Sequence, residues 1–159
     1  KIPYIKTVTA SVAENKVIYA QEFLTDGTTN FYKNGKNWLV LNPKKSKEAE
    51  TSIVFKYKTG NYDVVFVGAG ESNGASIFSF LVDKKEVGNF KLPATNKILE
   101  QGENFNALWQ NIKIKKGDKI KIKAKATSAG HKYARARWEG IVFVPVGKGK
   151  NVKNTPLSK

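Results

Sequence analysis

The residues of this chain best suited to a specific chemistry are its two arginines, Arg135 and Arg137, the only arginines among 159 residues. Tyr133 stands two positions before the first of them. Side chains of an extended chain alternate between two faces, so this spacing predicts that all three share one strand face. A guanidinium can donate two parallel hydrogen bonds to one oxyanion. The pattern therefore predicts a face that binds a long anion, with Lys132 and His131 as neighbouring cationic or donating groups.

The segment before the arginines is also strongly basic. From Lys113 to Arg137 the chain carries ten basic residues and one acid, Asp118. Between residues 119 and 126, lysines alternate with isoleucine and alanine, which predicts a strand whose lysines face solvent. Continued beyond Arg137, the same alternation predicts that Trp138 points into the core.

The overall charge indicates an anionic partner. The formal net charge is +15, which favours nucleic acid, an anionic membrane surface or an acidic polysaccharide as partner. The alternative is a generally lysine-rich, solvated surface. No apolar run is long enough to span a bilayer and no basic amphipathic helix is visible, so we expect no membrane insertion. Cysteine is absent, which excludes disulfides and thiolate metal sites.

The pattern of short apolar runs and turn residues predicts an all-β fold. We expect a β-sandwich jelly roll of about ten short antiparallel strands, the first of them at residues 16–23. Hairpin turns are predicted at Asn34-Gly35, Thr59–Asn61, Asp83–Glu86 and Lys116–Asp118. Only 93–103 favours a helical turn.

The sequence predicts one domain with two short flanks. Residues 16–146 are predicted to form the β-sandwich, 1–15 an N-terminal edge strand or linker, and 147–159 a basic C-terminal tail or linker. The chain starts at Lys1 and not at methionine, so we expect a piece of a longer protein.

A glycine-rich loop between Gly68 and Gly74 raises the possibility of phosphate binding. It is not followed by lysine and serine or threonine, and the next segment is a predicted strand, so a phosphate loop is excluded. Two interpretations stay open: a wide turn, or a loop that presents Glu71 and Asn73 to the hydroxyl groups of a ligand.

Catalysis is disfavoured, so the protein is not expected to be an enzyme. His131 is the only histidine, and no serine stands in a nucleophile-elbow context. Acidic pairs such as Glu100 with Glu103 lie among lysines and are expected to be solvated, and no calcium-loop spacing is present.

Two tryptophans are candidates for stacking on a ligand ring. Trp109 follows Asn106 in a stretch rich in asparagine and glutamine, whose amides match sugar hydroxyls. Trp38 has a similar setting after Asn34-Gly35, although its alternation with Val40 predicts core placement equally well.

Several segments, in their order, resemble family 6-like carbohydrate-binding modules, especially those appended to enzymes of marine bacteria that degrade agar, porphyran and carrageenan. The resemblance rests on residues 18–23 (IYAQEF), 26–27 (DG), 60–66 (GNYDVVF), 80–88 (FLVDKKEVG), Trp109, 114–122 (IKKGDKIKI) and 140–145 (GIVFVP).

This resemblance implies a β-sandwich jelly roll that holds sugar in a loop-end cleft or on a concave face, with the aromatic at Trp109 lining the cleft. It also implies a secreted, cell-surface or periplasmic protein with a tethered catalytic domain. Many such modules hold a structural calcium through an Ala-Glu-Asp-type motif. Here that stretch is Ala20-Gln21-Glu22, with glutamine where an acid is usual. The expectation is therefore no cofactor, with a structural calcium as the alternative.

The hypothesis from the sequence is a non-catalytic carbohydrate-binding module, expected to be monomeric, for a sulfated or otherwise anionic algal polysaccharide. Its candidate ligand-binding residues are Trp109, Tyr133, Arg135, Arg137, Lys132, His131, Glu71, Asn73, Asn106 and Trp38. The alternative is a single-stranded nucleic-acid-binding β-domain that uses the same basic face.

Overall fold

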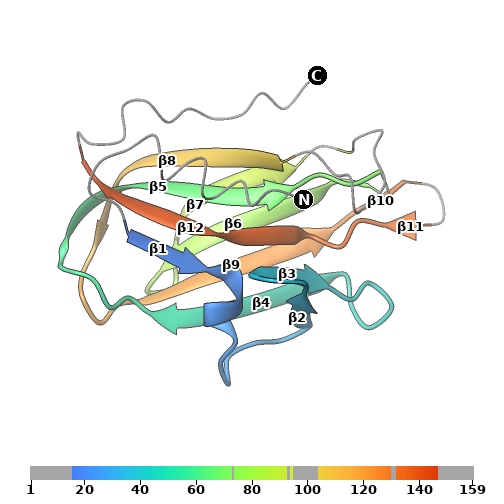
Figure 1. The fold of residues 1–159 in the computed structure, drawn as a ribbon, viewed down its shortest axis with the longest axis horizontal. Coiled ribbons are helices and arrows are strands. Elements are labelled where there is room, and N and C mark those ends of the chain that lie inside the picture. The colour runs from blue at the N-terminus through green and yellow to red at the C-terminus, as the bar shows by residue number, and fades with distance from the viewer. Residues whose placement is uncertain (1–15, 73, 93, 95–103, 130–131, 147–159) are drawn as a thin grey trace.

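The computed structural model describes residues 16–72, 74–92, 94, 104–129 and 132–146, and these form two packed antiparallel sheets (Figure 1). The elements in chain order are β1 (Lys16–Tyr19), the 3-10 helix η1 (Ala20–Phe23), β2 (Phe31–Asn34), β3 (Trp38–Leu41), β4 (Glu48–Val54), β5 (Gly60–Ala69), β6 (Ser76–Val82), β7 (Lys85–Leu92), β8 (Asn104–Ile114), β9 (Lys119–Ala126), β10 (Ser128–Ala129), β11 (Lys132–Tyr133) and β12 (Arg137–Pro145). The predicted all-β sandwich is confirmed.

The six-stranded sheet runs β2-β3-β12-β5-β8, and β1 pairs with β12 beside β3. Its central strands, β5 and β12, are buried on both faces. Phe66 and Phe143 point into the space between the sheets, while Val65 and Val142 belong to a second apolar cluster on the outer face. Burial on both sides explains why these strands have continuous apolar sequences and not an alternating pattern.

The four-stranded sheet runs β4-β9-β6-β7, and β9 shows the predicted alternation. Ile120 and Ile122 are buried, whereas Lys119, Lys123 and Lys125 are exposed. Trp138 is also buried as predicted, with its ring against Phe66 at a centroid distance of 5.6 Å. The core between the sheets is therefore largely aromatic.

Two of the predicted hairpins are confirmed and two are wrong. β2 pairs with β3 across Gly35, and β6 pairs with β7. β4, however, pairs with β9 while β5 lies in the other sheet, and the turn at Lys116–Asp118 likewise joins strands of different sheets. Turn residues specify where a chain reverses, but the sheet that a strand joins depends on long-range pairing.

The remaining local predictions are only partly tested. Residues 16–23 form a strand only as far as Tyr19 and then η1. The helical turn predicted at 93–103 and both flanks, 1–15 and 147–159, lie outside the described residues. Within the described ranges, no helix is long and apolar enough to cross a membrane.

Candidate functional site

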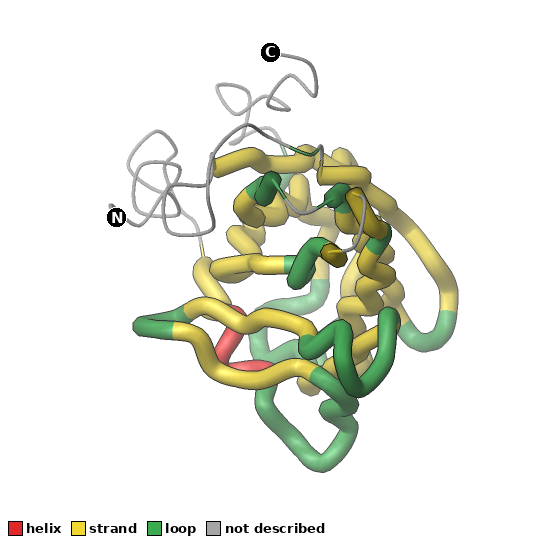
Figure 2. Tube along the Cα trace, turned by 90° about the vertical axis from the view of Figure 1, so that its right-hand side faces the viewer, coloured by secondary structure: helices red, strands yellow, loops and turns green. Residues whose placement is uncertain are grey.

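The candidate site lies at the end of the sandwich where β5 ends and β6 and β12 begin, the end that faces the viewer in Figure 2. We call this the arginine end. Residues 134–136 cross it between β11 and β12, where the strand that the alternation predicted is interrupted. Leu41 N donates to Arg135 O (2.6 Å), and Ala136 N donates to Ser76 Oγ (3.1 Å). These bonds fix the segment against both sheets, and within it Ala136 has a φ of 48°.

A buried glutamate organises this end. Glu71 is only 2% exposed, and its Oε1 accepts a hydrogen bond from Arg135 N. Its backbone bridges to Gly74 and Ala94, so one residue connects three loops. Its other oxygen, Oε2, has no hydrogen-bond partner among the described residues.

The pKa of the Glu71 carboxyl is raised above its ordinary value of 4.5 because burial disfavours the charged form. The hydrogen bond from Arg135 N and the charges of Arg137 and Arg135 act in the opposite direction without reversing the shift. Glu71 thus holds the loops together and lies within electrostatic reach of both arginines. An open hydroxyl-binding role for its side chain does not fit this burial.

Arg137 is buried and does not lie on an open face, which corrects the sequence prediction. Its side chain is 7% exposed, its Nη2 donates to Asn34 Oδ1 at 3.0 Å, and its guanidinium lies 4.9 Å from the centre of the Trp38 ring. The predicted shared face with Arg135 fails because the strand is broken at 134–136. Arg137 therefore holds the start of β12 against the β2–β3 hairpin, whereas Arg135, which is half-buried, remains accessible to a ligand.

Both candidate tryptophans take part in packing, Trp38 as a buried ring and Trp109 as a partly buried one. Trp38 is 7% exposed and supports Arg137. Trp109 lies inside β8 and not at a loop, nearly parallel to Phe80 (8°, centroids 5.4 Å apart), and its Nε1 donates to Asn89 O. A Cβ on Gly88 would approach the indole to 2.5 Å. The ring of Trp109 is therefore packed against the core and only partly exposed, and its stacking on a sugar stays a prediction.

The other predicted site residues have mixed outcomes. Asn106 is 3% exposed, opposite Val67 in β8, so it is too buried to meet a ligand. Lys132 and Tyr133 form β11, paired with β10 at the arginine end, but their side chains lie outside the described part. Asn73 and His131 are not described either.

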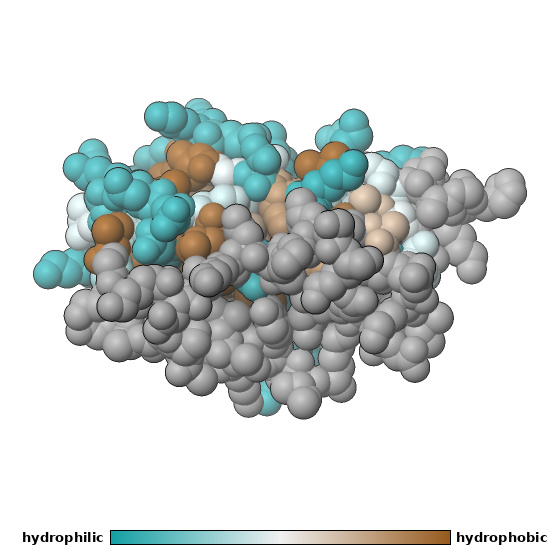
Figure 3. Space-filling view, turned by 90° about the horizontal axis from the view of Figure 1, so that it is seen from above, coloured by the Kyte–Doolittle hydropathy of each residue, from teal (hydrophilic) through white to brown (hydrophobic). Residues whose placement is uncertain are grey.

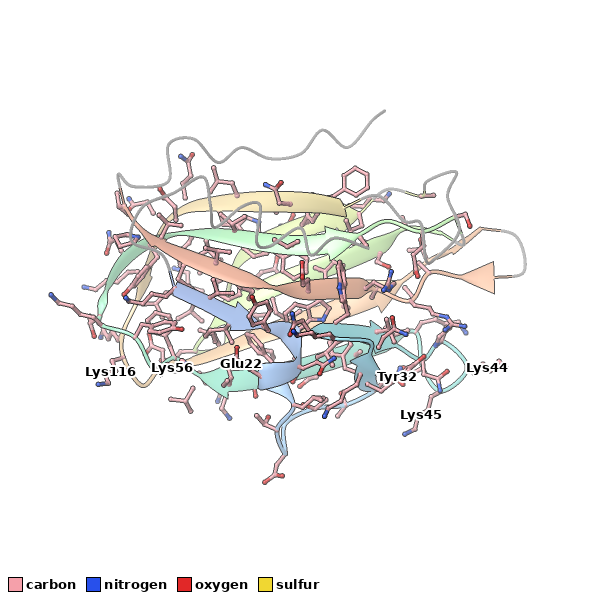
Figure 4. The ribbon with its side chains drawn as sticks, in the orientation of Figure 1. Glu22, Tyr32, Lys44, Lys45, Lys56 and Lys116 are labelled. Atoms are coloured by element: carbon pink, nitrogen blue, oxygen red, sulfur yellow. The ribbon has the colours of Figure 1, made fainter. Side chains whose placement is uncertain are left out.

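Sequence reasoning missed two residues at this end. Tyr32 is 41% exposed on the edge strand β2, on the same face as Asn34 and Trp38 because those residues alternate along the hairpin. Figure 4 shows Tyr32, Lys44 and Lys45 on the side of the molecule toward the arginine end. The alternation in residues 31–34 could have indicated an exposed tyrosine, but the partner that keeps Arg137 in place, Asn34, is a long-range contact that no local signal reveals.

A shallow hollow of about 260 Å³ lies beside this end, along the edge strand β4. Asn30 shapes it by donating from Nδ2 to the carbonyls of Asn42, Ser46 and Glu48. Its lining consists of Thr29, Asn30, Ser46, Glu48, Ala49, Glu50, Lys123 and Ala124. Neither arginine contributes to it.

The stretch that would carry a structural calcium does not fit a cation. Gln21 Nε2 donates to the carbonyls of Gly35 (2.6 Å) and Trp38 (3.1 Å), so the amide presents a donor to β3 in place of a carboxylate oxygen. Glu22 Oε2 accepts a bond from Tyr19 N (2.8 Å). Among the described residues, no cluster of three or more histidines, cysteines and acids is present.

No protein-family model matches the chain. An uncharacterized protein of Formosa agariphila is 46% identical over 153 residues, which cover 96% of this chain. The chain spans only 37% of the length of that relative.

Solved structures share the fold at low sequence identity. The CBM36-1 domain of a multidomain xylanase from the hindgut metagenome of Trinervitermes trinervoides matches with a TM-score of 0.57 and 12% identity, over 84% of this chain and 99% of that one. A CBM36 module in complex with calcium and xylotriose gives 0.55 and 16%, over 80% and 97%. The C-terminal CBM6 of the marine laminarinase LamC from Zobellia galactanivorans gives 0.53 and 13%, over 82% and 99%. The chain thus has the β-sandwich fold of carbohydrate-binding modules, as the sequence resemblance implied.

Proposed function

We propose that this chain is a non-catalytic carbohydrate-binding module for a sulfated or otherwise anionic polysaccharide of the agar, porphyran or carrageenan type. The observation that carries the proposal is the grouping of both arginines around Glu71 at the loop end of a fold shared with carbohydrate-binding modules. The charges of both guanidinium groups act on the Glu71 carboxylate, and a guanidinium can also meet an oxyanion of a ligand with two parallel hydrogen bonds.

In this proposal the two arginines have different tasks. Arg135 pairs with a sulfate group, since it is the arginine that remains partly exposed. Arg137, held by Asn34 and Trp38, keeps the loop in shape and adds its charge to the field. Lys132, His131 and Asn73 belong to the same loops and supply further contacts to sulfate and hydroxyl groups.

Sugar stacking is assigned to tyrosines. Tyr32 is exposed on the edge strand and offers an aromatic face at the same end, and Tyr133 of β11 is a second candidate. An aromatic ring contributes apolar contact that does not depend on salt. Stacking and sulfate pairing together would let the site distinguish a sulfated galactan from other polyanions.

The biological setting follows from the same proposal. A module of this kind, secreted or held at the cell surface or in the periplasm, would bind as a monomer and bring an attached enzyme to its substrate. The much longer relative is consistent with further domains. Weak binding at one site would be compensated by the repeated epitopes of a polymer.

Affinity electrophoresis tests the proposal. The chain is run against agarose, porphyran, carrageenans, alginate, heparin and single-stranded DNA, at low and moderate salt. Retardation by one or two galactans that survives moderate salt supports the proposal. Equal retardation by every polyanion, lost with salt, contradicts it and favours a general polyanion surface such as one for single-stranded nucleic acid.

Arg135→Gln is the matched variant, because Gln keeps the backbone bond to Glu71 and removes only the charge. We expect about tenfold weaker galactan binding, the loss of one charge-assisted contact. Arg137 is unsuitable for this purpose, since its truncation would disturb the fold. Lys123→Gln, on the outer face in the middle of β9, removes the same charge away from the loops of the arginine end and should leave galactan binding unchanged.

A further inference from the structure

The opposite end of the sandwich carries a dense group of lysines, and we call it the lysine end. It comprises the start of β1 and the three turns β4–β5, β6–β7 and β8–β9. In the described part of the chain, nine exposed lysines belong to it: Lys16, Lys56, Lys58, Lys84, Lys85, Lys113, Lys115, Lys116 and Lys119. Figure 4 shows Lys56 and Lys116 projecting at this end, and Figure 3 shows hydrophilic residues gathered there, at the left.

Backbone hydrogen bonds join these turns into one platform. Phe55 N donates to Asp118 O and Gly117 N donates to Phe55 O, both at 2.8 Å. Lys116 N donates to Thr59 Oγ1 at 2.9 Å, and Asp83 N donates to Lys119 O at 2.9 Å. The lysines are therefore carried by backbone that is already ordered, so a ligand need not order it.

The carboxylates of this end are few and mostly engaged with backbone. Asp118 Oδ2 accepts from Lys115 N at 2.8 Å, and Asp83 Oδ1 accepts from Lys119 N at 2.9 Å. Glu22 pairs with Lys56 at 3.7 Å, and Glu86 is exposed at the start of β7. Asp63, 7% exposed near the start of β5, accepts from Asn111 N at 3.0 Å. Within the described residues, nine lysines thus face five carboxylates, which leaves a positive potential.

An aromatic ring fixes two of the ammonium groups. Lys16 Nζ and Lys56 Nζ lie 5.5 and 5.4 Å from the centre of the Tyr57 ring, and Tyr57 Oη donates to Val17 O at 3.2 Å. Cation–π attraction at an exposed site is modest, and it favours these two positions of the ammonium groups. Two charges of the lysine end thus have a preferred place beside the Tyr57 ring.

We infer that the lysine end is a second binding surface, one that takes sulfated polymers by charge and is indifferent to the identity of the sugar. Lysine is a compact, hydrated point charge without the bidentate geometry of arginine, so this surface selects for charge density and not for shape. This inference rests on the proposed function in one respect, because that function supplies the class of partner, a sulfated polymer. Strands of eight to ten residues separate the two ends by about 30 Å, so one domain would hold two polymer segments at once.

Dextran sulfate is the probe, because it is sulfated but not a galactan. The test variant is Lys56→Gln with Lys58→Gln and Lys116→Gln, and the control is Lys91→Gln with Lys123→Gln and Lys125→Gln on the outer face of the four-stranded sheet. Both variants lose the same net charge. At low salt we expect about fivefold weaker binding for the test variant, with the control within about twofold of the wild type.

Turbidity with a carrageenan gives a second readout, since a domain whose two ends both bind this polymer cross-links its chains and the test variant should not. Equal weakening in both variants, or no weakening in the test variant, would overturn the inference. Running a carrageenan in parallel separates the two proposals. If the wild type binds carrageenan and dextran sulfate equally well, the proposed function is contradicted and the lysine surface is not. If the test variant binds dextran sulfate as strongly as the wild type does, only the lysine surface is contradicted.

Discussion

The two ends of the sandwich hold positive charge in opposite ways. At the arginine end a guanidinium is buried against Trp38 and Asn34, beside a carboxylate that is 2% exposed. At the lysine end the nine described lysines all have exposed side chains, and two of the acids are tied to backbone N–H groups.

Because of this difference, the arginine end can recognise the shape of a ligand, whereas the lysine end responds to its charge. A buried guanidinium and its partners occupy one geometry, so they can hold Arg135 at a fixed place and favour one ligand over another. Exposed lysines act through a field that is screened within about 10 Å at 0.1 M salt. Selectivity should therefore depend on the arginine end and salt sensitivity on the lysine end.

The largest effect that separates the ends is expected in stability. Arg137→Ala should lower the free energy of unfolding by about 3 kcal/mol, because a charge-assisted hydrogen bond and a buried cation–π contact are both lost. Lys116→Ala, at the other end, should change it by less than about 0.5 kcal/mol. Urea unfolding monitored by tryptophan fluorescence measures both. If the two variants were equally stable, Arg137 would not be the structural group that its burial indicates.

A smaller effect on stability is expected at Glu71, and it depends on pH. A carboxyl whose folded pKa is raised contributes stability that is fully present below its ordinary pKa and is lost as the pH rises through the folded value. At neutral pH the wild type therefore bears a cost that Glu71→Gln avoids, while the glutamine Oε1 can still accept from Arg135 N.

Unfolding of Glu71→Gln and of the wild type is compared between pH 3.5 and 7. The variant should be the more stable protein at pH 7, and the difference should vanish toward pH 3.5. Glu48→Gln, which removes an exposed carboxylate at the start of β4, is the control and should show no such trend. A variant that loses stability at pH 7 would mean that attraction to the arginines outweighs burial.

How far the sequence predicts these features depends on the range of the interactions. The alternation in β9, the β2–β3 turn and the inward Trp138 are local patterns, and all three were predictable. The crossing of β4 and β5 to different sheets was not, because turn residues do not select a partner strand.

The candidate site shows the same limit. The sequence predicted that residues near 71 and 135 serve one site, and the structure brings them together through the bond between Arg135 N and Glu71. The sequence could not predict that Ala136 interrupts the strand and that Arg137 turns inward. The contacts responsible come from Ser76 and Asn34, which are far away in the chain. The packing of Trp109 has the same origin: its ring contacts Phe80 and Gly88, which are far away in the chain and which its polar neighbours in sequence do not indicate.

At the lysine end, the hydroxyl of Tyr57 has a measurable but modest role. Tyr57→Phe removes the hydrogen bond to Val17 O and keeps the ring beneath Lys16 and Lys56. We expect a loss of about 1 kcal/mol in the free energy of unfolding and unchanged dextran sulfate binding. Tyr57→Leu, which also removes the aromatic face, should weaken binding as well. Equal binding by both variants would show that the ring does not position the lysines.

The smallest expected effect tests whether the lysine end acts through charge alone. Glu22 and Lys56 form an exposed ion pair at 3.7 Å, with 42% and 57% of their side chains exposed, and such pairs contribute little to stability. Glu22→Gln keeps an acceptor for Tyr19 N and removes one negative charge from the platform. The free energy of unfolding should change by less than about 0.5 kcal/mol.

Binding to dextran sulfate should strengthen by about twofold at low salt and return to the wild-type value at high salt, because screening removes a purely electrostatic gain. Galactan selectivity, which belongs to the arginine end about 30 Å away, should stay the same. A change in selectivity with this substitution would mean that the two ends are coupled, and the separation of shape from charge would then fail.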